Sequence, residues 1–134
     1  MSSIEIKRVT DKRGLDTFIQ LHYDLYRGNK FDAPNLYRDE VNTLSRDKNS
    51  AFDFCEAEYF LAYRDGKVVG RVAAIINHRY NEQWQRPCVR FGWLDLIDDA
   101  EVMRALLNAV EEYGKQKGMK EIIGPLGFTD MDPE

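Results

Sequence analysis

The stretch FGWLDLIDDAEVMRALLNAVEEYG, residues 91–114, decides the fold, because its apolar residues change from the spacing of a strand to that of a helix. The first part predicts a strand over 88–97. Asp98 or Asp99 stands where a helix N-cap is expected. The connection holds no glycine and carries three acids, Asp98, Asp99 and Glu101. A strand that runs into a helix is a common phosphate site, so these acids raise the question of whether a phosphate binds here.

The helix that follows is predicted to reach about Lys117, with Gly118 ending it. Upstream, two apolar runs flank Asp65-Gly66, a pair that supplies the positive φ angles of a tight hairpin turn. The strand after this turn is expected from Val68 to about Arg79, with a polar loop beyond it. Gly70 inside that strand indicates a bulge or a close backbone approach.

The remaining elements complete one α/β (α+β) domain. They are a strand over 4–9, helices over 12–27 and 35–46, and a last strand over 120–128 that is broken at Gly124-Pro125. The order is therefore β-α-α-β-β-β-α-β. A hairpin-rich sheet followed by a β-α-β crossover predicts a mixed, mostly antiparallel sheet with one parallel pair.

Composition narrows the function classes. The 134 residues are enough for one domain, and the net charge of −4 argues against nucleic acid as a partner. The chain has no apolar run long enough to span a bilayer, so no membrane partner and a cytoplasmic location are expected. Its cysteines and histidines lack the spacing of a metal site, and we expect Cys55 and Cys88 to be buried thiols.

Three stretches resemble the GNAT superfamily of acetyl-CoA-dependent N-acyltransferases, and the resemblance covers nearly all of the chain. They are YFLAYRDGKVVGRVAAI (59–75), the strand-to-helix unit FGWLDLIDDAEVMRALLNAVEEYGKQKG (91–118) and KEIIGPLGF (120–128). The second and third are also similar to a group of larger bacterial GNAT-like proteins of poorly defined substrate. The resemblance implies a GNAT-like domain over 1–134 that lacks its last helix and two strands.

The resemblance also implies where a donor would bind. In this superfamily acetyl-CoA lies in a splay between the fourth and fifth strands, and its diphosphate accepts hydrogen bonds from the start of the following helix. Carried onto this chain, the pantetheine arm would meet the main chain at Leu94 and Leu96. The diphosphate would meet the backbone of Asp99, Val102 and Met103.

The diphosphate motif of the superfamily, Q/R-x-x-G-x-G/A, falls on Asp98, Glu101 and Met103, and all three positions depart from it. A carboxylate at about 4 Å from a phosphate costs about 4 kcal/mol at an effective dielectric near 20. Acids in a first helical turn are instead stabilised by the helix dipole. Two hypotheses therefore stay open: an acyl-CoA N-acyltransferase acting on a small amine, or a degenerate GNAT-like domain that binds no CoA and has a structural or interaction role.

The resemblance implies a catalytic carboxylate on the fourth or fifth strand, and Asp95 is the candidate base. Alternation places its side chain on the face opposite Leu94 and Leu96. An edge or surface acid is the other interpretation. No tyrosine follows Phe128 to act as general acid.

Other polar and aromatic residues have both a functional and a structural interpretation. His78 would end a strand beside a loop, and His22 lies on an apolar helix side. Arg79, Arg86 and Arg90 could bind an anion or form a solvated face. Tyr23, Tyr26, Phe31 and Tyr37 could line an acceptor pocket or belong to the core. Gly124 and Gly127 could form a loop that another group approaches closely, or a plain strand break. An open edge on the last strand predicts a homodimer or a partner domain that covers it.

Overall fold

The computed structural model describes residues 3–25 and 34–125, without the side chains of 22–24 and 34–37. Its elements, in chain order, are β1 (Ile4–Arg8), α1 (Lys12–Leu25), α2 (Pro34–Leu44), the short 3₁₀ helix η1 (Ser50–Asp53), β2 (Cys55–Arg64), β3 (Lys67–Asn77), α3 (His78–Trp84), β4 (Cys88–Leu96), α4 (Ala100–Gln116) and β5 (Glu121–Ile123). No helix among these residues is both long and apolar enough to cross a membrane.

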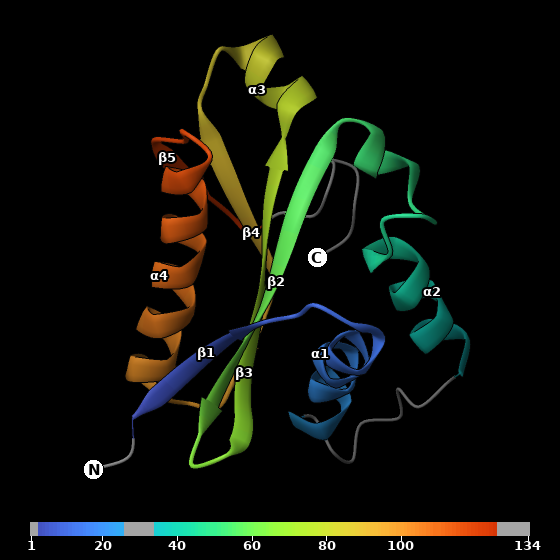
Figure 1. Cartoon of the computed structure of the whole chain (residues 1–134), viewed down its shortest axis with the longest axis vertical. Helices are drawn as coiled ribbons and strands as arrows, with labels where there is room; N and C mark the ends of the chain where they lie inside the picture. The colour runs from blue at the N-terminus through green and yellow to red at the C-terminus, as the bar shows by residue number, and fades with distance from the viewer. Residues whose placement is uncertain (1–2, 26–33, 126–134) are drawn as a thin grey trace.

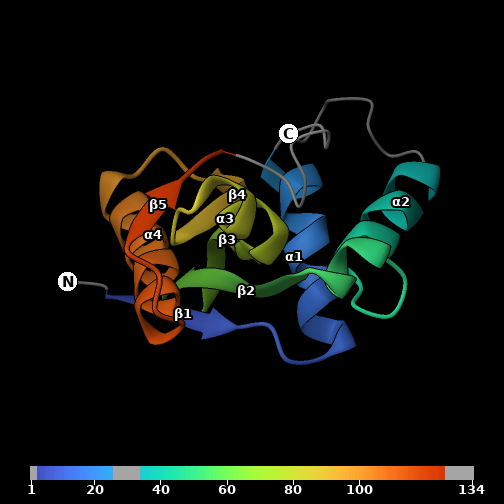
Figure 2. The same ribbon diagram turned by 90° about the horizontal axis from the view of Figure 1, so that it is seen from above.

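The five strands form one sheet in the order β1-β2-β3-β4-β5, antiparallel except for the parallel pair β4–β5. This confirms the predicted mixed, mostly antiparallel sheet. Figure 2 shows a layered arrangement, with α4 on one face and α1 and α2 on the other. α3 stands at one end of the sheet (Figure 1).

Each face of the sheet has its own hydrophobic core, because alternate residues of β2 and β3 point to opposite sides. The core under α1 and α2 contains Phe18, Ile19, Leu44, Tyr59, Leu61, Ala73 and Ile75. The core under α4 contains Phe60, Ala62, Val72, Ala74, Val102, Leu106 and Val110. β3 is therefore covered on both sides, and Val72 to Ile76 are fully buried.

The structure confirms two predictions about the β2–β3 hairpin, the tight turn at Asp65-Gly66 and the close approach at Gly70. Asp65 and Gly66 turn the hairpin with φ angles of 53° and 78°, the left-handed values that a tight two-residue turn needs. Gly70 lies against α4, where an added Cβ would come within 2.9 Å of Leu106 and 3.0 Å of Val102. The absence of a side chain at Gly70 lets the helix pack directly on the sheet.

The predicted end of the third strand is wrong. The strand stops at Asn77 instead of Arg79, and α3 replaces the first part of the predicted loop. The Asn77 side chain accepts a hydrogen bond of 2.9 Å from the Tyr80 N–H, so Asn77 is the N-cap of α3. A seven-residue helix has too few turns to show an apolar period, which is why the sequence pattern indicated a loop.

Cys55 and Cys88 are both buried thiols, as predicted. Burial raises the pKa of the Cys88 thiol, which keeps it in the unreactive protonated form. No group of three His, Cys, Asp or Glu side chains within the described ranges could hold a metal ion.

Candidate functional site

Among residues 3–25 and 34–125, the outer edge of β4 has a strand partner over only part of its length. β5 pairs with β4 only at Cys88, Val89 and Arg90. Gly124 still lies against β4, because an added Cβ there would come within 2.6 Å of the Phe91 carbonyl oxygen. Beyond Phe91, no strand within the described ranges pairs with this side of β4, so its main-chain groups there need a partner other than the described strands. We call Gly92–Leu96 the open β4 edge.

A β-bulge lies within the open β4 edge. Arg71 and Ala73 of β3 pair with Asp95 and Gly92, so β4 carries one extra residue between them. Trp93 takes up this residue with a φ of 51°, a left-handed value that is uncommon outside glycine. The bulge re-aims the side chains of the strand.

After the bulge, the side chains of β4 divide between the two faces. Leu94 and Leu96 pack against the core under α4, whereas Trp93 packs against the core under α1 and α2. Asp95 also points to the α1 side, where it meets Arg71. This confirms that Asp95 lies on the face opposite Leu94 and Leu96.

Asp95 is half of a buried ion pair. Its Oδ2 accepts hydrogen bonds from Arg71 Nη2 at 2.7 Å and from Nε at 3.1 Å. The Arg71 side chain is only 4% exposed, and it also donates to the Phe18 carbonyl of α1 at 2.9 Å. Its guanidinium stacks on the Phe18 ring. The pair therefore fastens α1 to the strand that carries the bulge.

The N-terminus of α4 is already occupied by a carboxylate. Asp99 is the N-cap, and its Oδ1 accepts the Glu101 N–H at 2.9 Å. Its Oδ2 forms a close ion pair with Arg64, which also approaches Glu101 at 3.4 Å. The Arg64 guanidinium and the backbone N–H groups of Glu101 and Val102 hold the pKa of Asp99 below its usual range, against the opposing effect of burial. Asp99 thus takes helix N–H groups that a diphosphate would need.

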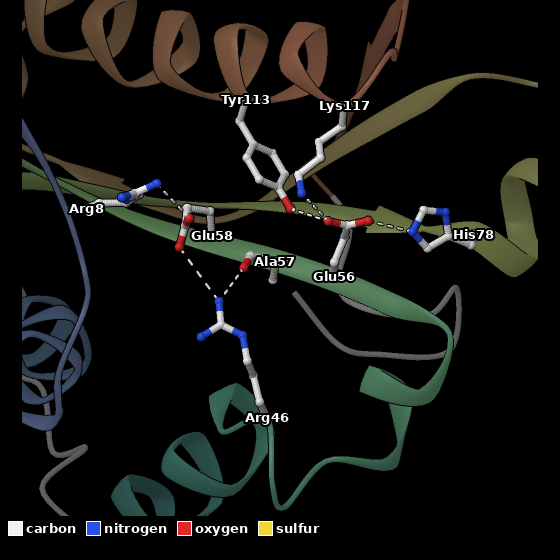
Figure 3. A network of polar contacts seen from close by, with 8 residues as sticks. All are labelled: Arg8, Arg46, Glu56, Ala57, Glu58, His78, Tyr113 and Lys117. Carbon is white, nitrogen blue, oxygen red and sulfur yellow. Dashed lines mark hydrogen bonds and ion pairs between the residues drawn. The ribbon is translucent and has the colours of Figure 1, made fainter.

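A second polar group lies at the opposite end of α4 (Figure 3). Glu56 of β2 contacts His78 Nε2 at 2.7 Å and Lys117 Nζ at 2.9 Å. The Tyr113 hydroxyl lies 3.5 Å from the same carboxylate. These contacts join the start of β2 to the start of α3 and the end of α4. His78, a candidate from the sequence, therefore begins a helix and joins an ion-pair group.

Glu58 extends this group toward α2. It lies between Arg8 at 3.4 Å and Arg46 at 3.7 Å, and a pocket of about 320 Å³ opens beside them. Arg46 also donates to the Ala57 carbonyl at 2.7 Å, on the part of β2 that β1 does not cover. Both glutamates are thus matched by cations. We call this group, made of Arg8, Arg46, Glu56, Glu58, His78, Tyr113 and Lys117, the clasp, because it joins β1, the segment after α2, α3 and α4 to the part of β2 that β1 does not cover.

The clasp predicts a pH dependence of stability. Burial would raise the pKa of Glu56, but hydrogen bonds from Lys117 and His78 outweigh it and lower the pKa from its usual 4.5. A lowered folded-state pKa gives stability that is present above the unfolded-state pKa and is lost as pH falls through the folded one. Glu56→Gln should therefore lower the free energy of unfolding at neutral pH and flatten its decline on acidification. Urea denaturation at a series of pH values from neutral to acidic measures the free energy of unfolding at neutral pH and the steepness of its decline.

Glu112→Gln is the matched control, because Glu112 is an exposed glutamate on α4. It should leave the acid decline of the parent unchanged. An equally steep decline in the Glu56→Gln variant would contradict the role of the clasp.

The three arginines predicted as a group have different partners. Arg79 stacks on Phe54, Arg86 pairs with Glu121 at 2.7 Å, and Arg90 is buried against Tyr80. Each of the three arginines thus has a different partner, and Arg90 is not part of a solvated face. The remainder lie outside the described residues: Tyr26, Phe31, Gly127 and the side chains of His22, Tyr23 and Tyr37.

Comparison with solved structures identifies the class. The chain has the fold of the GNAT N-acetyltransferases. Aminoglycoside N-acetyltransferase AAC(6′)-Iy in complex with CoA matches with a TM-score of 0.65 and 23% identity, over 95% of this chain and 79% of that one. The open β4 edge and the bulge therefore lie in a GNAT fold. No protein-family model matches the chain.

Curated relatives also match by sequence. Protein YghO of Escherichia coli (strain K12) is 31% identical over 124 residues, which are 92% of this chain and 32% of that protein. The bacterial ceramide synthase of Caulobacter vibrioides is 30% identical over 95 residues, 70% of this chain and 25% of that protein. The chain thus spans about a third or less of the length of these two relatives.

Proposed function

We propose that this chain is an N-acyltransferase domain that takes an acyl thioester along the open β4 edge and passes the acyl group to an amine on the α1 and α2 side. The observation that carries the proposal is that, among the described residues, no strand pairs with the outer side of β4 beyond Phe91, next to a bulge and in a GNAT fold. The relative named as a ceramide synthase supports an amide product, because a ceramide is an amide.

The donor would be held chiefly by its pantetheine arm. Main-chain groups at Leu94 and Leu96 lie on the open β4 edge, where an extended arm can hydrogen-bond as an added strand would. The backbone of Asp99, Val102 and Met103 would face the diphosphate, but the Asp99 carboxylate already takes helix N–H groups there. We therefore propose that the diphosphate of acetyl-CoA adds little affinity in this chain.

Asp95 is the candidate base on β4. A base must be free to accept a proton, and Oδ2 of Asp95 already accepts two hydrogen bonds from Arg71. This pairing favours a charged carboxylate that supports the fold. Any catalytic contribution of Asp95 would have to act from within the ion pair.

A degenerate domain without CoA binding is the second candidate. The Asp99–Arg64 pair favours it, because this pair closes the anion site at the start of α4. Such a domain would have a structural or interaction role within a larger protein.

Calorimetry with acetyl-CoA and with S-acetylpantetheine separates these possibilities. If the arm carries the binding, the two ligands should bind with dissociation constants within about threefold of each other, which is under 1 kcal/mol. Binding of neither ligand at millimolar concentration would establish the degenerate domain. Acetyl-CoA binding more than about tenfold tighter would show that the diphosphate is held despite Asp99.

A further inference from the structure

Glu40 of α2 lies against the bulge of β4. The indole Nε1–H of Trp93 donates to both carboxylate oxygens of Glu40, at 3.1 Å to Oε1 and 3.3 Å to Oε2. Both residues are half-buried, so the carboxylate is neither fully solvated nor sealed off. One shared N–H leaves most of the acceptor capacity of a carboxylate unused.

The charge of Glu40 is not balanced by a cation within the described part of the chain. Asp95 is paired with Arg71 and Asp99 with Arg64, but none of the ion pairs among residues 3–25 and 34–125 includes Glu40. A partly desolvated carboxylate without a counter-charge favours a bound cation. Glu40 is thus chemically suited to receive a positive group.

The location of Glu40 specifies where such a group would lie. Trp93 is the bulged residue of the open β4 edge, and its side chain points to the α1 and α2 side. A thioester lying along this edge would be approached by its acceptor from that side. A cation held by Glu40 would then be next to the bulge, on the opposite face of the sheet from α4.

We propose that Glu40 binds the ammonium group of a primary amine and so positions the acceptor beside β4. The role in acyl transfer rests on the function proposed above, whereas the binding of the amine does not. Glu40 is thereby distinct from Asp95, whose charge is already matched.

The indole N–H signals of the 134-residue chain in a heteronuclear NMR spectrum test this site directly. The chain has two tryptophans, Trp93 and the exposed Trp84, and Trp84→Phe assigns their signals. Octylammonium chloride, added without any acyl donor, should shift the Trp93 signal saturably and leave the Trp84 signal in place. Octanol, which has the same chain length and no charge, should not shift the Trp93 signal.

Glu40→Gln should weaken the apparent affinity for octylammonium by at least about tenfold, and Glu112→Gln should leave it unchanged. An unchanged affinity in Glu40→Gln, an equal shift with octanol, or an unmoved Trp93 signal would each overturn the proposal. If Glu40→Gln does not fold, the comparison of the two ligands on the parent chain still decides. Amine binding without binding of S-acetylpantetheine would overturn acyl transfer alone.

Discussion

Asp99→Gly is expected to strengthen the binding of acetyl-CoA by at least about tenfold, which corresponds to about 1.4 kcal/mol. The substitution removes a carboxylate from the start of α4, releases the Glu101 N–H and frees Arg64 to meet a phosphate. The Asp99 carboxylate would repel a phosphate held at the start of α4, and exposure to water screens this repulsion. Glycine is an acceptable N-cap, so helix stability should fall by only a few tenths of a kcal/mol.

Asp98→Asn is the matched control, because it removes an equal charge from an exposed neighbour that does not cap the helix. Calorimetry should show little change for this variant, and S-acetylpantetheine should bind parent and Asp99→Gly alike. An equal gain from Asp98→Asn would assign the effect to general charge. No gain from Asp99→Gly would mean that the α4 N–H groups do not contact the ligand.

Arg71→Met is expected to lower the free energy of unfolding by about 3–5 kcal/mol, because it leaves Asp95 buried without its counter-charge. It also removes the hydrogen bond to the Phe18 carbonyl and so loosens α1 from the sheet. Urea denaturation measures the loss. Arg104→Met, on the exposed side of α4, should change stability by less than about 0.5 kcal/mol.

The double variant Arg71→Met, Asp95→Leu should recover much of the loss, since no unpaired charge then remains. A single Arg71→Met variant as stable as Arg104→Met would show that the ion pair adds nothing to stability.

Asp95→Asn separates the structural role of Asp95 from a catalytic one. If it abolishes acyl transfer while the free energy of unfolding stays unchanged, Asp95 is the base and its structural role is minor.

Local patterns were sufficient for much of the fold. The Asp65-Gly66 turn and the limits of α4 follow from residues that lie next to one another in the chain, since a turn needs left-handed angles and a helix needs a cap. α3 escaped prediction because one cap at Asn77, rather than an apolar period, defines it. The third strand was therefore extended two residues too far.

The candidate site depends on residues that are distant in sequence. Acids after Ile97 are visible in the chain, but their partner Arg64 lies 35 residues before Asp99. The pairing of Arg71 with Asp95 requires the register of β3 and β4, which a bulge shifts by one residue. Glu40 belongs to no motif, and its half-buried position and its contact with Trp93, neither visible in the sequence, distinguish it from the exposed acids of the helices.

The separate cores on the two faces of the sheet also bear on how such a chain can diversify. Side chains under α1 and α2 have few neighbours in common with those under α4, because the strand backbones insulate one layer from the other. Substitutions in one layer should thus be energetically additive with those in the other. During evolution, residues on the face that carries Glu40 could then be substituted to suit new amines while the residues of the opposite layer stay the same.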